Sequence, residues 1–179
     1  MNRELVWTAQ KWQGVEHATL RVTDTGLIVD SALIAVPDEQ PIRLRYGLEC
    51  ESSWSPLRVT VDVYGRPPVS LAREGDRWFD GDGRERRDLA GCLDVDIALT
   101  PLTNTIPIRR LALDPGESAD LDVVYIHPGR TVDVSAQRQR YTRTGDGFRY
   151  QSGSFRADLR VNADGIVTEY PGLWTLTFP

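Results

Sequence analysis

Two acidic and two basic side chains bracket one short segment near the middle of the chain. Asp94 and Asp96 lie two residues apart in an alternating run, and Arg109 and Arg110 follow a proline-containing bend. On a strand, residues two apart share a face and lie about 7 Å from each other. A similar separation is found between the acid and the base of some glycoside hydrolases. A catalytic pair is therefore one interpretation of the two carboxylates.

The same four charges admit two other interpretations. Acids and arginines on either side of a bend can pair in a buried cluster that fixes the register of the strands, and we expect at least one such pair. The arginines could instead bind a headgroup, with Asn104 in the bend as a further polar contact. The chain has no nucleophile elbow, Ser-His-Asp arrangement or phosphate loop, so we assign no catalytic residue. An enzyme acting on a sugar or lipid-linked substrate through Asp94, Asp96 and Arg109 is the alternative function.

The residue inventory gives little support to metal or cofactor chemistry. His17 and His127 lie in separate alternating segments, and Cys50 and Cys92 are far apart without metal-ligand spacing. We therefore expect two buried thiols, no metal site and no cofactor.

Length and charge restrict the class of protein. The chain has 179 residues and a formal net charge of -5, so we expect a single domain spanning residues 1–179 with one well-buried core. A negative net charge disfavours nucleic acid as a partner. No apolar run reaches the roughly 18 residues of a membrane span, and the start does not resemble a signal peptide. We expect a cytoplasmic protein that does not span a membrane, and the sequence assigns no oligomeric state.

Period-two alternation of polar and apolar residues recurs along the whole chain and is interrupted by turn signals. The pattern predicts an all-β fold of roughly twelve to fifteen strands with little or no helix. So many strands do not remain flat, and a single strongly curved antiparallel sheet, a roll or half-barrel, is expected. The central segment is predicted as a strand from Leu93 to Leu99, a bend, and a second strand from Ile108 to Leu113. Trp7 and Trp12 could cap the open end of such a roll.

A set of short motifs occurs from the central segment to the C-terminus. It comprises Gly91-Cys92, Asp94-Val95-Asp96, Thr100-Pro101, Thr103-Asn104-Thr105, Pro107-Ile108-Arg109-Arg110-Leu111, Gln139-Arg140-Tyr141, Tyr150, Asp164-Gly165 and Tyr170-Pro171-Gly172. With this set the chain resembles the bacterial family described as putative glycolipid-binding proteins. The resemblance implies a spiral β-roll with an apolar concave side, similar to the half-barrel of bacterial lipoprotein carriers. It also implies a glycolipid or another amphiphilic small molecule as the partner.

Aromatic residues on the predicted strands are the candidate lining of a ligand cavity. If the roll encloses one, we expect Tyr46, Trp54 and Tyr150 in its wall and Arg109 at its mouth, in contact with the headgroup. No amphipathic helix is expected to cover the apolar side of the sheet. The roll must then close on its own side chains or keep a cavity.

Overall fold

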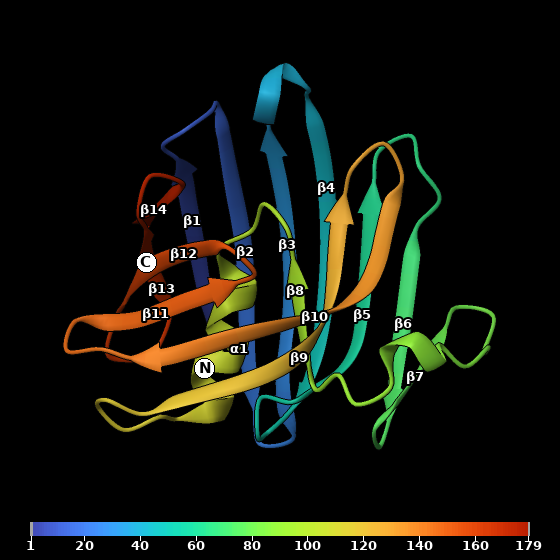
Figure 1. The fold of residues 1–179 in the computed structure, drawn as a ribbon. Helices are drawn as coiled ribbons and strands as arrows, with labels where there is room; N and C mark the ends of the chain where they lie inside the picture. The colour runs from blue at the N-terminus through green and yellow to red at the C-terminus, as the bar shows by residue number, and fades with distance from the viewer. Residues whose placement is uncertain (1, 179) are drawn as a thin grey trace.

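The computed structural model describes residues 2–178 as one strongly curved sheet (Figure 1). Strands account for 60% of the chain and helix for 9%, so the predicted all-β class is confirmed. The strands are β1 (Asn2–Ala9), β2 (Gly14–Thr23), β3 (Gly26–Ala35), β4 (Ile42–Glu51), β5 (Pro56–Val63), β6 (Val69–Glu74), β7 (Arg77–Asp80), β8 (Asp94–Ile97), β9 (Ser118–Pro128), β10 (Val132–Arg143), β11 (Gly147–Ser152), β12 (Phe155–Val161), β13 (Val167–Tyr170) and β14 (Trp174–Phe178). The helices are η1 (Pro37–Glu39), η2 (Arg87–Leu89), η3 (Leu102–Asn104) and α1 (Thr105–Leu111).

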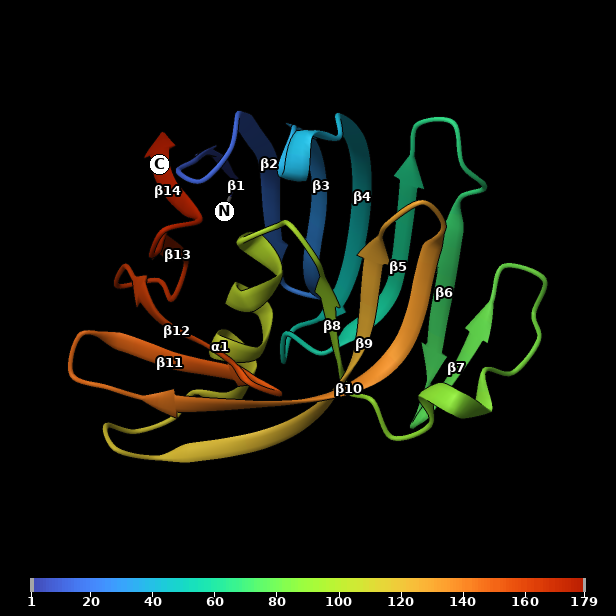
Figure 2. The same cartoon turned by 45° about the horizontal axis from the view of Figure 1, so that its top comes forward.

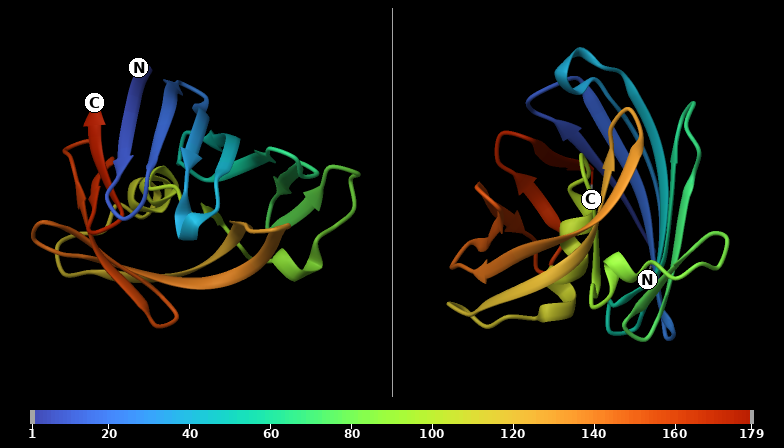
Figure 3. Two further views of the ribbon diagram at one scale, coloured as in Figure 1. Left: turned by 90° about the horizontal axis from the view of Figure 1, so that it is seen from above. Right: turned by 45° about the vertical axis from the view of Figure 1, so that its right-hand side comes forward.

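The sheet consists of two meanders that meet where the chain ends meet. Strands β1 to β7 pair in chain order in one meander, and β8 to β14 pair in chain order in the other. Strand β1 pairs with β14 in antiparallel orientation, which places the two ends of the chain side by side (Figure 3). Strands β7 and β8 are the two edges, so the sheet curls without closing.

Alternation along the strands separates an inner face from an outer face. On β3 and β4 the residues Leu33 and Leu44 are direct partners, and both are fully buried on the inner side. Their chain neighbours Ile34 and Arg43 are also partners, and both are exposed. The period-two pattern therefore identified the strands because each strand has one buried face and one solvated face.

The prediction of a second strand from Ile108 to Leu113 is wrong. The chain instead forms η3 and α1 after β8. Pro107 is the third residue of α1, in the first turn, where a missing backbone N–H removes no intrahelical hydrogen bond. The Oγ1 of Thr105 accepts a hydrogen bond from the Val167 amide at 3.1 Å, which ties the start of the helix to β13.

Helix α1 lies inside the roll, between the two halves of the curved sheet (Figures 2 and 3). Leu102, Ile106 and Ile108 of the helical segment are buried in the common core. This corrects the expectation that no helix covers the apolar side. The segment also connects β8 to β9, which pair in parallel. The sheet was predicted to be antiparallel, and this one pair differs from the prediction. A parallel pair needs such a crossover because a tight turn can join only antiparallel neighbours.

Candidate functional site

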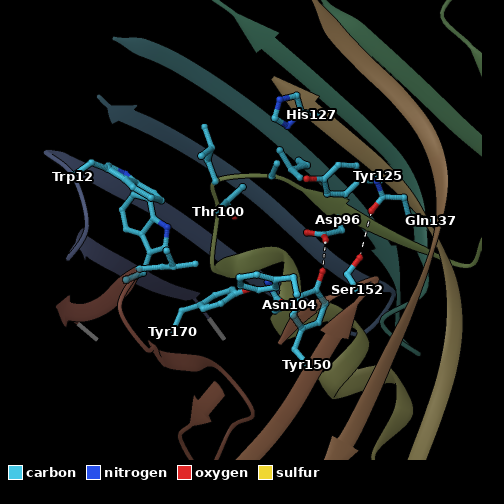
Figure 4. Close-up of a pocket in the computed structure, with 16 residues that line it drawn as sticks. Trp12, Asp96, Thr100, Asn104, Tyr125, His127, Gln137, Tyr150, Ser152 and Tyr170 are labelled. Atoms are coloured by element: carbon cyan, nitrogen blue, oxygen red, sulfur yellow. Dashed lines mark hydrogen bonds between the residues drawn. The ribbon is translucent and has the colours of Figure 1, made fainter. Parts of the chain in front are cut away.

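A pocket of about 430 Å³ lies on the concave side of the sheet (Figure 4). This volume is within the range of small-molecule binding sites. Its walls come from β8 and the loop that follows it, from strands β9 to β14, and from the loop after β1. The lining residues are Trp12, Asp96, Ile97, Ala98, Leu99, Thr100, Asn104, Tyr125, His127, Gln137, Tyr150, Ser152, Phe155, Tyr170, Leu173 and Trp174.

The pocket has a polar floor and a largely apolar rim. We call its buried polar residues the floor: Asp96, Thr100, Asn104, Tyr150 and Tyr170. Its partly or fully exposed residues are of two kinds. Trp12, Ala98, Leu99, Phe155 and Leu173, which we call the rim, are apolar, whereas Tyr125, His127, Gln137 and Ser152 carry polar groups. A ligand in this pocket would therefore meet hydrogen-bonding groups in the floor and both apolar and polar groups in the more exposed part.

Asp96 is the carboxylate of the floor and is held by neutral donors. Gln139 Nε2 donates to its Oδ2 at 2.6 Å, Tyr150 OH donates to the same oxygen at 3.3 Å, and Thr103 Oγ1 donates to Oδ1 at 3.1 Å. Burial raises the pKa of Asp96, and these three hydrogen bonds oppose the shift. A carboxylate offers about four acceptor positions, so one remains for a ligand.

Asp94 is neutralised in a different way. Arg110 donates from Nε and Nη2 to the two carboxylate oxygens of Asp94 at 2.9 and 2.6 Å. The Asp94 side chain is 0% exposed and that of Arg110 is 18% exposed. Burial raises the pKa of Asp94, and Arg110 opposes the shift. The expected pairing of an acid with an arginine is thus present, but neither residue lines the pocket.

Three other predicted ligand contacts also lie away from the pocket. The Arg109 guanidinium lies 4.9 Å from the centre of the Trp54 ring, and its Nη1 donates to the Asp164 carbonyl at 3.0 Å. Tyr46 is buried in the core. Arg109 is therefore not at the mouth of the pocket, and neither Tyr46 nor Trp54 is in its wall.

Of the eight predicted site residues, the structure brings Asp96, Asn104 and Tyr150 together in the pocket. The alternative catalytic set of Asp94, Asp96 and Arg109 does not converge there, because only Asp96 lines it.

Three polar pocket residues, His127, Gln137 and Ser152, were not identified from the sequence. The His127 ring on β9 stacks with the ring of Tyr125, with centroids 6.3 Å apart. Gln137 on β10 and Ser152 on β11 form a polar part of the wall. The available signal was alternation, because Gln137 and Gln139 occupy inward positions of β10 and their neighbours Ala136, Arg138 and Arg140 are exposed.

A second buried carboxyl, Glu16 on β2, is connected to the floor of the pocket. Its Oε1 accepts hydrogen bonds from Tyr46 OH and, at 2.8 Å, from Ser31 Oγ. Tyr46 OH also lies 3.1 Å from Thr100 Oγ1, which reaches the floor. Burial raises the pKa of Glu16 to about 7, although the hydrogen bonds from Tyr46, Ser31 and Thr100 oppose the shift.

Within residues 2–178, no group of three or more histidine, cysteine or acidic residues is arranged to hold a metal ion. In the same part of the chain no helix has the length and hydrophobicity needed to cross a membrane. Cys50 and Cys92 are both buried and free.

A single open sheet, rolled around one short helix and carrying a pocket with a polar floor, defines this protein as a β-roll with a ligand-sized site. The profile of the family described as "Putative glycolipid-binding" matches residues 4–175, so the chain belongs to this family, as the motif resemblance indicated. A similar solved structure is that of a DUF1089 family protein from Pseudomonas aeruginosa, with 34% sequence identity and a TM-score of 0.79. The match covers 89% of this chain and 91% of that one. No curated protein matches the chain.

Proposed function

We propose that this protein binds a glycolipid or a related amphiphile in the pocket described above. The observation that carries the proposal is that one pocket of about 430 Å³ combines a buried polar floor with the apolar residues of the rim. An amphiphile likewise combines a polar headgroup with an apolar chain. The family description supports a glycolipid as the class of ligand.

The two parts of the pocket have different roles in the proposed complex. The rim residues Trp12, Leu99 and Phe155 would cover the apolar chain, and burial of that surface drives binding. The floor residues Asp96 and Asn104 would hydrogen-bond the headgroup and fix its orientation. The headgroup therefore enters first, and the chain extends towards the opening.

The rest of the concave side is occupied by the protein itself. Leu33 and Leu44 are fully buried, and Ile106 from α1 packs into the same core. Leu44 lies on the concave side but does not line the pocket. A larger side chain at this position would disturb the core and would not block a ligand in the pocket. A blocking substitution belongs in the pocket wall, where Ser152 is small and half-buried.

Titration with octyl β-glucoside below its critical micelle concentration tests the proposal. Isothermal calorimetry should show saturable binding of about one molecule per chain, and Ser152→Phe should weaken it at least tenfold by filling the wall. Ser118→Phe is the matched control, because Ser118 is exposed on the outer face of β9 and should leave binding unchanged. Binding by Ser152→Phe as tight as that of the unmodified protein would contradict the proposed site.

A further inference from the structure

The lining of the pocket in residues 2–178 offers no permanently charged cation to an anionic headgroup, and its one imidazole, His127, is exposed to solvent. Among the residues that the structure describes, the lining contains one carboxylate, Asp96, and no arginine or lysine. The two arginines after the central bend are engaged elsewhere: Arg110 holds Asp94, and Arg109 binds the Asp164 carbonyl.

The arginines near the rim do not supply the missing charge either. Arg149 and Arg156 border a separate surface hollow that shares Phe155 and Leu173 with the pocket rim. Arg149 is paired with Asp158, with Nε 2.8 Å from the carboxylate. Arg156 is exposed and lines that other hollow but not the pocket. An anion at the pocket floor would therefore face Asp96 without a counter-ion in the pocket lining.

The hydrogen-bonding groups around the pocket include both acceptors and donors. Asp96 has an acceptor position left over. Asn104 Oδ1 accepts from Tyr141 OH at 2.9 Å, which leaves its amide nitrogen as the group available to a ligand. A hydroxyl group both donates and accepts, so a sugar can satisfy both groups, whereas an ionised phosphate or sulfate can only accept.

We infer that the headgroup bound by this pocket is uncharged and rich in hydroxyl groups, as in a neutral sugar. The inference rests on the proposed function, because it assigns the headgroup of the ligand proposed to bind there. A sugar hydroxyl can donate a charge-assisted hydrogen bond to Asp96, which is stronger than a bond between neutral groups. A phosphate at the same position would be repelled by Asp96, and the buried surroundings strengthen that repulsion.

Three ligands with the same octyl chain separate the outcomes: octyl β-glucoside, octyl phosphate and octylammonium. Calorimetry at pH 8, below the critical micelle concentrations, should show the glucoside binding at least tenfold more tightly than either charged ligand. Octyl phosphate binding as tightly as the glucoside, or octylammonium binding more tightly, would overturn the headgroup assignment while amphiphile binding stands. If none of the three binds, the proposed function itself fails.

A charge-gain variant tests the reason for the selectivity. Gln137 is half-buried in the pocket wall, and its Oε1 accepts a long hydrogen bond from Ser152 Oγ at 3.4 Å. Gln137→Arg should raise the ratio of the octyl phosphate affinity to the octyl β-glucoside affinity at least tenfold. Ser118→Arg makes the same charge change on the outer face and should leave this ratio unchanged. An unchanged ratio in Gln137→Arg would show that the missing cation is not what excludes anions.

Discussion

The two acids of β8 are two residues apart, yet they have different hydrogen-bond partners. Asp94 has a cationic partner in Arg110, whereas Asp96 has only the neutral donors Gln139, Thr103 and Tyr150. The bidentate pair serves to anchor the end of α1 to β8. The neutral set leaves Asp96 without a cationic partner, and Asp96 lines the pocket whereas Asp94 does not. Asp96 is therefore the one of the two acids that we propose as a ligand contact.

Removal of Arg110 should destabilise the fold. Arg110→Ala leaves the Asp94 carboxylate, which is 0% exposed, buried without its cation. Loss of one partner of a buried pair costs about 3 kcal/mol of the free energy of unfolding, measurable by urea denaturation at pH 7. Arg138→Ala is the control, because the Arg138–Asp122 pair is largely exposed and its loss should cost less than about 1 kcal/mol. Equal stability of the two variants would show that Asp94 is solvated.

The free energy of unfolding should decrease as the pH rises, because the buried Glu16 carboxyl is more costly to ionise in the folded state. Its pKa is about 7 in the folded protein and 4.5 ordinarily, so between these values the folded state holds more protons than the unfolded state. The contribution of Glu16 is therefore fully present below pH 4.5 and is lost as the pH rises through about 7. A pKa difference of this size corresponds to on the order of 3 kcal/mol.

Glu16→Gln isolates this contribution. Glutamine keeps an acceptor oxygen for Tyr46 and Ser31 but does not ionise. The free energy of unfolding of the variant minus that of the unmodified protein should increase between pH 4 and pH 8. Urea denaturation across this range measures the difference, in which the other titrating groups cancel. Parallel stability curves for the two proteins would contradict the prediction.

At the scale of elements, the strands could be predicted from the sequence and the helix could not. Strand alternation is set by local chemistry, because each strand has one face in the core. Helix α1 has seven residues, too few for an isolated helix to be stable in water. Its Ile106 and Ile108 are β-branched and favour strands. Burial of these residues against the sheet decides its conformation, and no local pattern reports that burial.

The same limit applies to the candidate site. Arg109 and Trp54 were both predicted as ligand contacts, and they do lie together, but outside the pocket. Asn104 and Tyr150 were identified through the bend and the family motifs, and both line the floor. His127 and Gln137 alternate like ordinary strand residues. Their place in the pocket depends on tertiary pairing, because β8 lies beside β9 with Asp96 opposite Tyr125, and β10 follows as the next strand.

At the scale of the whole molecule, the pairing of β1 with β14 joins the two ends of the chain. Apart from it, each strand pairs with neighbours in the sequence. The contacts of this seam join residues far apart in the chain: Thr8 Oγ1 on β1 and Thr177 Oγ1 on β14 lie 3.1 Å apart across 169 residues. Bringing such distant segments together costs conformational entropy of the unfolded chain. A covalent link across the seam would remove much of this entropy from the unfolded state.

A disulfide across this seam should therefore stabilise the fold. Thr8 Oγ1 and Thr177 Oγ1 lie 3.1 Å apart on the exposed side of β1 and β14. The combined variant Thr8→Cys and Thr177→Cys should form an intramolecular bridge under mild oxidation, since Cys50 and Cys92 are buried and do not compete. Closing so long a loop should add about 2–4 kcal/mol to the free energy of unfolding. Urea denaturation with and without reductant measures the gain, and each single-cysteine variant is the control. Failure of the pair to cross-link within one chain would show that the two ends of the chain do not pair in solution.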